Sequence, residues 1–86
     1  NDGYYETILT LLPEKQQTLL AAIASEGEVS TPTSGQFVSR YGLTSASSVS
    51  SALKALTDKE LIYHAPSEYH VYDRFFAMWL KAKFRR

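Results

Sequence analysis

The sequence contains no cysteine, which excludes disulfide bonds, thiolate catalysis and cysteine-ligated metal sites. No run approaches the roughly 18 apolar residues that a membrane-spanning helix needs, and no signal peptide is visible. The chain also lacks the G-x-x-x-x-G-K-[ST] phosphate-binding loop, because its four glycines stand singly. We therefore expect a cytoplasmic domain with no membrane partner, no catalytic or metal site and no cofactor of its own.

The chain also has no net charge at pH 7. The 86 residues carry nine basic and nine acidic side chains, and the pI is about 6.9. A pI above about 9 is typical of domains that bind nucleic acid strongly through charge. The charge is unevenly divided, since residues 1–43 hold two basic and five acidic side chains, whereas residues 44–86 hold seven and four. This balance argues against tight DNA binding by the chain alone.

The composition that is present indicates a single globular domain. Hydrophobic residues make up 44% of the chain and aromatic residues 13%, which is enough for one modest core at this length. Because the chain does not begin with methionine, we expect it to be part of a longer protein with a preceding N-terminal region.

Apolar residues at helical spacing predict a leading helix in residues 1–12 and a second helix after it. Pro13 suits the first turn of the second helix, and Glu26-Gly27 suits its end, because glycine adopts the left-handed cap conformation. The apolar stripe of this helix is predicted to face a core and consists of Leu19, Leu20, Ile23 and Ala24.

A helix-turn-helix motif is predicted over residues 31–60. Thr33-x-x-Gln36 fits a capping box at the start of its first helix, and Gly42 with Leu43 fits a Schellman ending. Thr44 or Ser45 caps the second helix, residues 45–58. The inner face of that helix is predicted to comprise Val49, Ala52, Leu53 and Leu56.

Two β-rich runs, residues 61–64 and 69–72, flank a four-residue loop and predict a hairpin. We expect His64 and His70 to face each other across it, although two histidines do not complete a metal site. Asp73 caps a closing helix in residues 73–86. Core packing is expected for the aromatic residues of this half, namely Tyr63, Tyr69, Tyr72, Phe75, Phe76 and Trp79.

Together these elements predict a mainly α domain with a small β-hairpin, a winged helix-turn-helix. A leading helix (1–12) would precede a three-helix core (13–60), a wing hairpin (61–72) and a closing helix (73–86).

Several segments resemble a known family of such domains. Five of these segments lie in the first two-thirds of the chain: Ile23-Ala24, Pro32-Thr33-Ser34, Tyr41-Gly42-Leu43, Ser47-Ser48-Val49 and Ala52-Leu53-x-x-Leu56. The most specific segment runs from Tyr69 to Leu80 and is similar to the family pattern Y-x-V-x-D-x-x-F-x-x-W-L, with Arg74 where members often carry proline. Over residues 13–80 the chain resembles the winged-helix module that follows the ATPase core in archaeal-type P-loop ATPases of the AAA/STAND group, which also occur in bacteria.

The resemblance implies a parent P-loop NTPase whose upstream ATPase domain, in the same chain, binds ATP and Mg²⁺. The present chain has no phosphate-binding loop and is therefore expected to be a non-catalytic accessory domain. Its implied partners are the upstream ATPase domain, another protein domain or DNA.

The candidate contact residues lie in two groups. A DNA-reading motif helix would present its outer face, residues Ser47, Ser50, Ser51 and Lys54, to a major groove, although serine specifies little. The densest basic cluster, which could contact phosphate or be a solvated helix end, comprises Lys81, Lys83, Arg85 and Arg86. Two functions stay open: a protein-interaction or domain-coupling module, and a DNA-binding module that uses the 45–58 helix.

Overall fold

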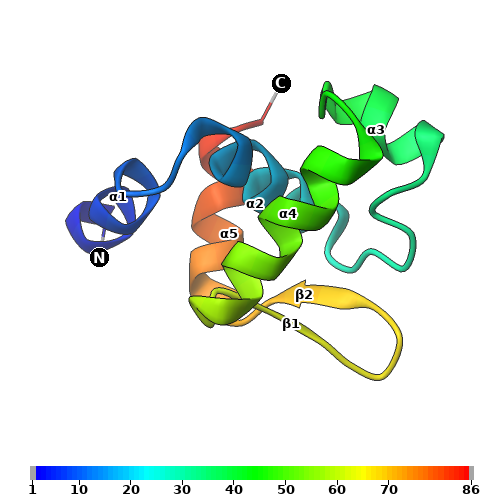
Figure 1. Ribbon diagram of the computed structural model, residues 1–86. Helices are drawn as coiled ribbons and strands as arrows, with labels where there is room; N and C mark the ends of the chain where they lie inside the picture. The colour runs from blue at the N-terminus through cyan, green and yellow to red at the C-terminus, as the bar shows by residue number, and fades with distance from the viewer. Residues whose placement is uncertain (1, 86) are drawn as a thin grey trace.

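Helix α2, Glu14–Glu26, lies at the centre of the fold (Figure 1). The computed structural model describes residues 2–85. α2 packs against both α4 (Ala46–Asp58) and α5 (Arg74–Lys83). Its predicted stripe is buried, and its end at Gly27 is confirmed, where φ is 85° and the glycine N–H donates to the Ile23 carbonyl. Pro13 is the N-cap residue, one position ahead of the first turn in which it was expected.

The predicted helix-turn-helix motif is formed by α3, Gly35–Tyr41, and α4 (Figure 1). The N-cap of α3 is Ser34, whose Oγ accepts from the Phe37 N–H at 3.2 Å, so the capping box predicted at Thr33 is wrong. The Ser34 N–H donates to the Thr31 carbonyl at 3.1 Å, and this turn leaves Thr33 outside the helix. At the start of α4 the predicted cap is confirmed as Ser45, which accepts from the Ser48 N–H at 3.1 Å.

Both helices of the motif end with the same hydrogen-bond pattern. At the end of α3, the Leu43 N–H donates to Val38 O at 2.9 Å and Gly42 has a φ of 64°, which confirms the predicted Schellman ending. At the end of α4, the Leu61 N–H donates to Leu56 O at 3.0 Å, and the left-handed residue is Glu60 with a φ of 61°. A side chain therefore occupies a conformation that favours glycine.

The hairpin consists of β1, Ile62–His64, and β2, Tyr69–Val71, which are antiparallel. In its register Tyr63 pairs with His70 and His64 pairs with Tyr69, so the expectation that the two histidines face each other is wrong. The outer edge of β2 is also paired, because Val29 and Tyr69 exchange two backbone hydrogen bonds of 3.0 and 2.7 Å. This third strand position, between α2 and α3, has no signal in the sequence.

The closing helix α5 and the leading helix α1, Asp2–Thr10, complete the core. Asp73 caps α5 as predicted, with its carboxylate accepting from the Phe75 N–H at 2.9 Å. Tyr5 of α1 stacks on Phe76 of α5 with the ring centroids 5.0 Å apart. The buried hydrophobic side chains form one cluster from all these elements, and its fully buried large members include Leu19, Leu20, Ile23, Leu56, Ile62, Phe76 and Leu80.

The expected burial of the aromatic residues is only partly correct. Phe76 is 2% exposed, and Tyr69 and Trp79 are half-buried against the core. By contrast, Tyr72 is 66% and Phe75 is 72% exposed, and Tyr63 is exposed on the outer face of the hairpin. Helical and strand spacing predicts that residues share a face, but it does not determine whether another element covers that face.

Candidate nucleic-acid and partner interfaces

The outer face of α4 carries the first group of candidate residues. Ser47, Ser50, Ser51 and Lys54 are all exposed, as the sequence predicts, while the opposite face of the helix is buried. Ser47 Oγ lies 3.3 Å from the capping Ser45 Oγ, so this serine also takes part in the cap. In a winged helix this is the face that a DNA reader places in the major groove.

Lys54 is the only basic residue within α4, and it is engaged in an ion pair. Its Nζ lies 3.4 Å from Asp58 Oδ2, one turn along the helix, and both side chains are largely exposed. The pair lies in a groove of about 320 Å³ between α4 and the hairpin, to which Tyr69 of β2 contributes. The positive charge that a DNA phosphate would meet here is therefore offset by a neighbouring carboxylate.

The wing tip, residues 65–68, adds no positive charge. Its sequence is Ala65-Pro66-Ser67-Glu68, and Ser67 Oγ donates to the Glu68 carboxylate at 3.1 Å. The His70 ring nitrogen Nε2 lies 2.9 Å from the Ala65 carbonyl oxygen and supports the loop. A wing of this kind offers little to a phosphate backbone.

The structure separates the basic residues at the end of α5. Lys83 contacts α1, because its Nζ lies 3.1 Å from Glu6 Oε1 and 5.5 Å from the centroid of the Trp79 ring. Lys81 and Arg85 instead line a pocket with residues of α2 and α3. Arg86 lies outside the described residues. The predicted basic cluster is thus divided between an internal contact and a surface pocket.

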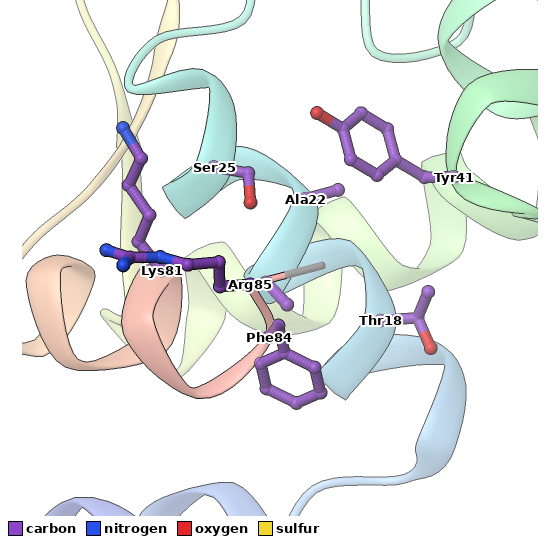
Figure 2. Close-up of a pocket in the computed structure, with 8 residues that line it drawn as sticks. Thr18, Ala22, Ser25, Tyr41, Lys81, Phe84 and Arg85 are labelled. Atoms are coloured by element: carbon purple, nitrogen blue, oxygen red, sulfur yellow. The ribbon is translucent and has the colours of Figure 1, made fainter.

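The pocket beside Lys81 and Arg85 has a volume of about 470 Å³ (Figure 2). α2 supplies one wall with Thr18, Ala21, Ala22 and Ser25. Another wall is formed by Lys81 of α5 and by Phe84 and Arg85, which follow the end of that helix. Figure 2 shows Lys81 and Arg85 along one edge, with Tyr41 of α3 on the other side of the α2 residues. The basic tail was singled out from the sequence, but the α2 and α3 walls were not, because they are brought together only by the fold.

Tyr41 is held in place by a carboxylate at the end of α2. Its hydroxyl donates to Glu26, which also accepts from Arg40 Nη1 at 3.1 Å. The Tyr41 hydrogen bond lowers the pKa of Glu26 below its usual value, Arg40 adds to this effect, and partial burial opposes it. Burial raises the pKa of Tyr41, and the Glu26 carboxylate raises it further. This cluster joins the ends of α2 and α3 and had no signal in the sequence.

A second surface lies on the outer side of α5, and we call it the α5 apolar surface. It comprises Tyr72, Phe75 and Met78, which are 66%, 72% and 67% exposed. Phe75 and Met78 lie three residues apart on one helix and are therefore surface neighbours. Tyr72 contacts Tyr63 of the hairpin edge-on, with the ring centroids 5.6 Å apart. No residue in the described part of the chain buries these side chains.

Within residues 2–85, no group of three or more histidine, aspartate and glutamate side chains is placed to hold a metal ion. In the same part of the chain, no helix has both the length and the apolar character needed to cross a membrane.

Comparison with known proteins assigns the fold. The family model described as "Probable winged helix domain" matches residues 3–82, which is nearly the whole chain. No curated protein and no solved structure matched the sequence. The matched region covers all of α1 and α5 except one end residue of each, and it contains the other helices and the hairpin, in the order expected for a winged helix. The chain therefore belongs to this family of winged-helix domains.

Proposed function

We propose that this winged-helix domain contacts another protein domain, as a non-catalytic accessory or coupling module of a P-loop ATPase in the cytoplasm. The α5 apolar surface carries this proposal. Its three large apolar side chains are each about two-thirds exposed or more. Grouped apolar side chains that stay in water are typical of surfaces that bind another protein. Winged-helix domains are generally non-catalytic, which agrees with a contact role.

The ATPase part of the proposal is supported by the sequence. The segment from Tyr69 to Leu80 resembles the module that follows the ATPase core in archaeal-type P-loop ATPases. Asp73 and Trp79 in this segment have defined structural roles, as the cap of α5 and as a ring packed against Phe76 at 6.0 Å. The proposed partner is an ATPase domain upstream in the same chain, which would bind ATP and Mg²⁺.

DNA binding through α4 is the alternative function. It is favoured by the winged-helix fold, by the exposed serine face of α4 and by the exposed cations Lys81 and Arg85. However, DNA affinity depends mainly on charge, and the lysine of α4 is paired with Asp58. The wing tip carries a glutamate and no cation. We therefore place protein contact ahead of DNA contact.

Protein contact is tested with the proposed ATPase domain of the parent protein, and the sequence upstream of Asn1 is first read for a phosphate-binding loop. Calorimetric titration of that domain with this chain should give binding that Phe75→Ala combined with Met78→Ala weakens. The control is Leu11→Ala, because Leu11 is equally apolar and 78% exposed but lies outside the α5 apolar surface. If the upstream region has no phosphate-binding loop, the ATPase assignment is wrong. If the domains do not associate, the coupling role is wrong.

DNA contact is tested by fluorescence anisotropy with mixed-sequence duplex DNA at low and moderate salt. We expect no binding tighter than about 100 μM at moderate salt, which is the weak end of non-specific affinity. Micromolar binding that falls steeply with salt and weakens with Lys54→Ala would establish the DNA-binding alternative instead.

A further inference from the structure

The pocket between α2 and α5 joins an apolar floor to a cationic edge. Ala21 and Ala22 are buried in its floor, and Phe84 lines its side with 38% of its surface exposed. Lys81, in the last turn of α5, and Arg85, which follows the end of that helix, lie along the edge of the same pocket (Figure 2). A ligand seated here would meet apolar carbon at its centre and positive charge on one side.

The two cations are available for an external partner. The ion pairs within residues 2–85 join Arg40 to Glu26, Lys54 to Asp58 and Lys83 to Glu6. None of them includes Lys81 or Arg85, and both of these side chains are exposed. The nearby Glu26 carboxylate is bonded to Tyr41 and Arg40, so it is already occupied.

We propose that this pocket binds an acidic segment of a partner protein, with one large apolar side chain in the pocket and flanking carboxylates on Lys81 and Arg85. The inference rests on the proposed protein-contact function and adds the chemistry of the partner. The volume of about 470 Å³ is within the range of small-ligand pockets and accommodates one aromatic or large aliphatic side chain with some backbone. Arginine is well suited to a carboxylate because its planar guanidinium makes two parallel hydrogen bonds.

A nucleic acid fits the same pocket less well. The affinity for a nucleic acid rises with each additional cation that contacts its phosphates, and among residues 2–85 only two cations line this pocket. The alanine carbon of its floor and the Phe84 ring at its side offer a phosphate no hydrogen-bond donor, and the Thr18 and Tyr41 hydroxyls in its lining already donate to the Glu14 carbonyl and the Glu26 carboxylate. An acidic peptide with one large apolar side chain would contact both the apolar floor and the cationic edge of the pocket.

The test uses the 86-residue chain and a fluorescein-labelled heptapeptide with a central tryptophan and three acidic residues on either side. Binding is measured by anisotropy, and its location by amide chemical shifts. Lys81→Glu combined with Arg85→Glu should weaken binding by about tenfold or more, because attraction becomes repulsion at both positions. Lys81→Glu and Arg85→Glu are also measured singly, and the matched control for each is Arg74→Glu, which makes the same single charge reversal at an exposed position of α5 that does not line the pocket.

Three further measurements locate the two parts of the ligand. A peptide with alanine in place of tryptophan should bind at least about fivefold more weakly if the pocket holds the anchor. Ser25→Phe, which places a ring in the pocket, should weaken binding without reversing a charge. The amide signals of Thr18, Ala22 and Phe84 should shift on titration, whereas those of the wing should not.

The inference is overturned if the peptide does not bind, if Arg74→Glu weakens binding as much as the pocket variants, or if the alanine peptide binds equally well. It is also overturned if a single-stranded oligonucleotide of the same charge binds the pocket more tightly than the peptide. None of these results tests the α5 apolar surface, so the proposed function is tested separately by the calorimetric titration with the ATPase domain.

Discussion

Replacing Glu60 by glycine should stabilise the domain. The ends of α3 and α4 share one geometry, with left-handed residues at Gly42 (φ 64°) and Glu60 (φ 61°). At the end of α4 the Glu60 N–H donates to Thr57 O at 3.0 Å, and at the end of α3 the Gly42 N–H donates to Ser39 O at 3.4 Å. The same backbone requirement is therefore met once by glycine and once by a residue with a Cβ atom.

The magnitude follows from two opposing terms. A residue with a Cβ atom in the left-handed region costs about 1–2 kcal/mol relative to the right-handed one. Glycine loses about 0.5–1 kcal/mol more conformational entropy on folding. Glu60→Gly should therefore raise the free energy of unfolding by about 0.5–1 kcal/mol, which corresponds to a rise in Tm of roughly 2–8 °C for a domain of this size.

The assay is thermal and urea unfolding followed by far-ultraviolet circular dichroism. Glu60→Ala is the control, because it removes the carboxylate from the negative end of the α4 dipole but keeps a Cβ atom. Gly42→Ala should lower stability by about the amount that Glu60→Gly gains, since a Cβ atom at Gly42 meets no atom within 4 Å and only the backbone term changes. If Glu60→Gly is no more stable than Glu60→Ala, the conformational reasoning is refuted.

Two further predictions concern the core and the pocket wall. Phe76→Ala should lower the free energy of unfolding by about 3–5 kcal/mol because the ring is fully buried, whereas Trp79→Ala should lower it by only about 2 kcal/mol because its ring is half-buried. Urea unfolding of the two variants measures both values. A larger loss of stability for Trp79→Ala than for Phe76→Ala would contradict the burial assignment. The lowered pKa of Glu26 means that its contribution to stability is present above its usual value of 4.5 and is lost as the pH falls through the lower folded value. Tyr41→Phe removes the main cause of this pKa shift, so the free energy of unfolding of the variant should change less steeply with pH on the acid side than that of the unsubstituted chain. Equal slopes for the two chains would show that the hydrogen bond from Tyr41 to Glu26 has no effect.

Helix boundaries were predictable wherever one short-range signal fixes them. Ser45, Gly42 and Asp73 each act on residues within one turn, and each has the role that the sequence assigned to it. At the start of α3 two hydroxyl residues are adjacent, and the turn from Thr31 to Ser34 selects Ser34 instead of Thr33. The sequence alone does not distinguish these two caps.

Features that depend on distant segments could not be predicted. Val29 forms a single bridge and has no periodic neighbours that would mark a strand. Phe75 and Phe76 are adjacent in sequence, yet one is exposed and the other buried, because only one side of α5 is covered by α1 and α2. Likewise, Lys81 and Arg85 were candidates from their charge, but the α2 wall beside them is set by packing.

The pairing of Val29 with Tyr69 has a consequence for the order of folding. This pair closes a loop that contains the whole helix-turn-helix motif, residues 31–60. Closing a long flexible loop costs chain entropy, and the cost falls once α3 and α4 have shortened the loop by folding. We therefore expect Tyr69 of the wing to pair with Val29, in the loop that precedes α3, only late in folding. The amide protons of Val29 and Tyr69 should then be protected from exchange only when the motif between them is formed.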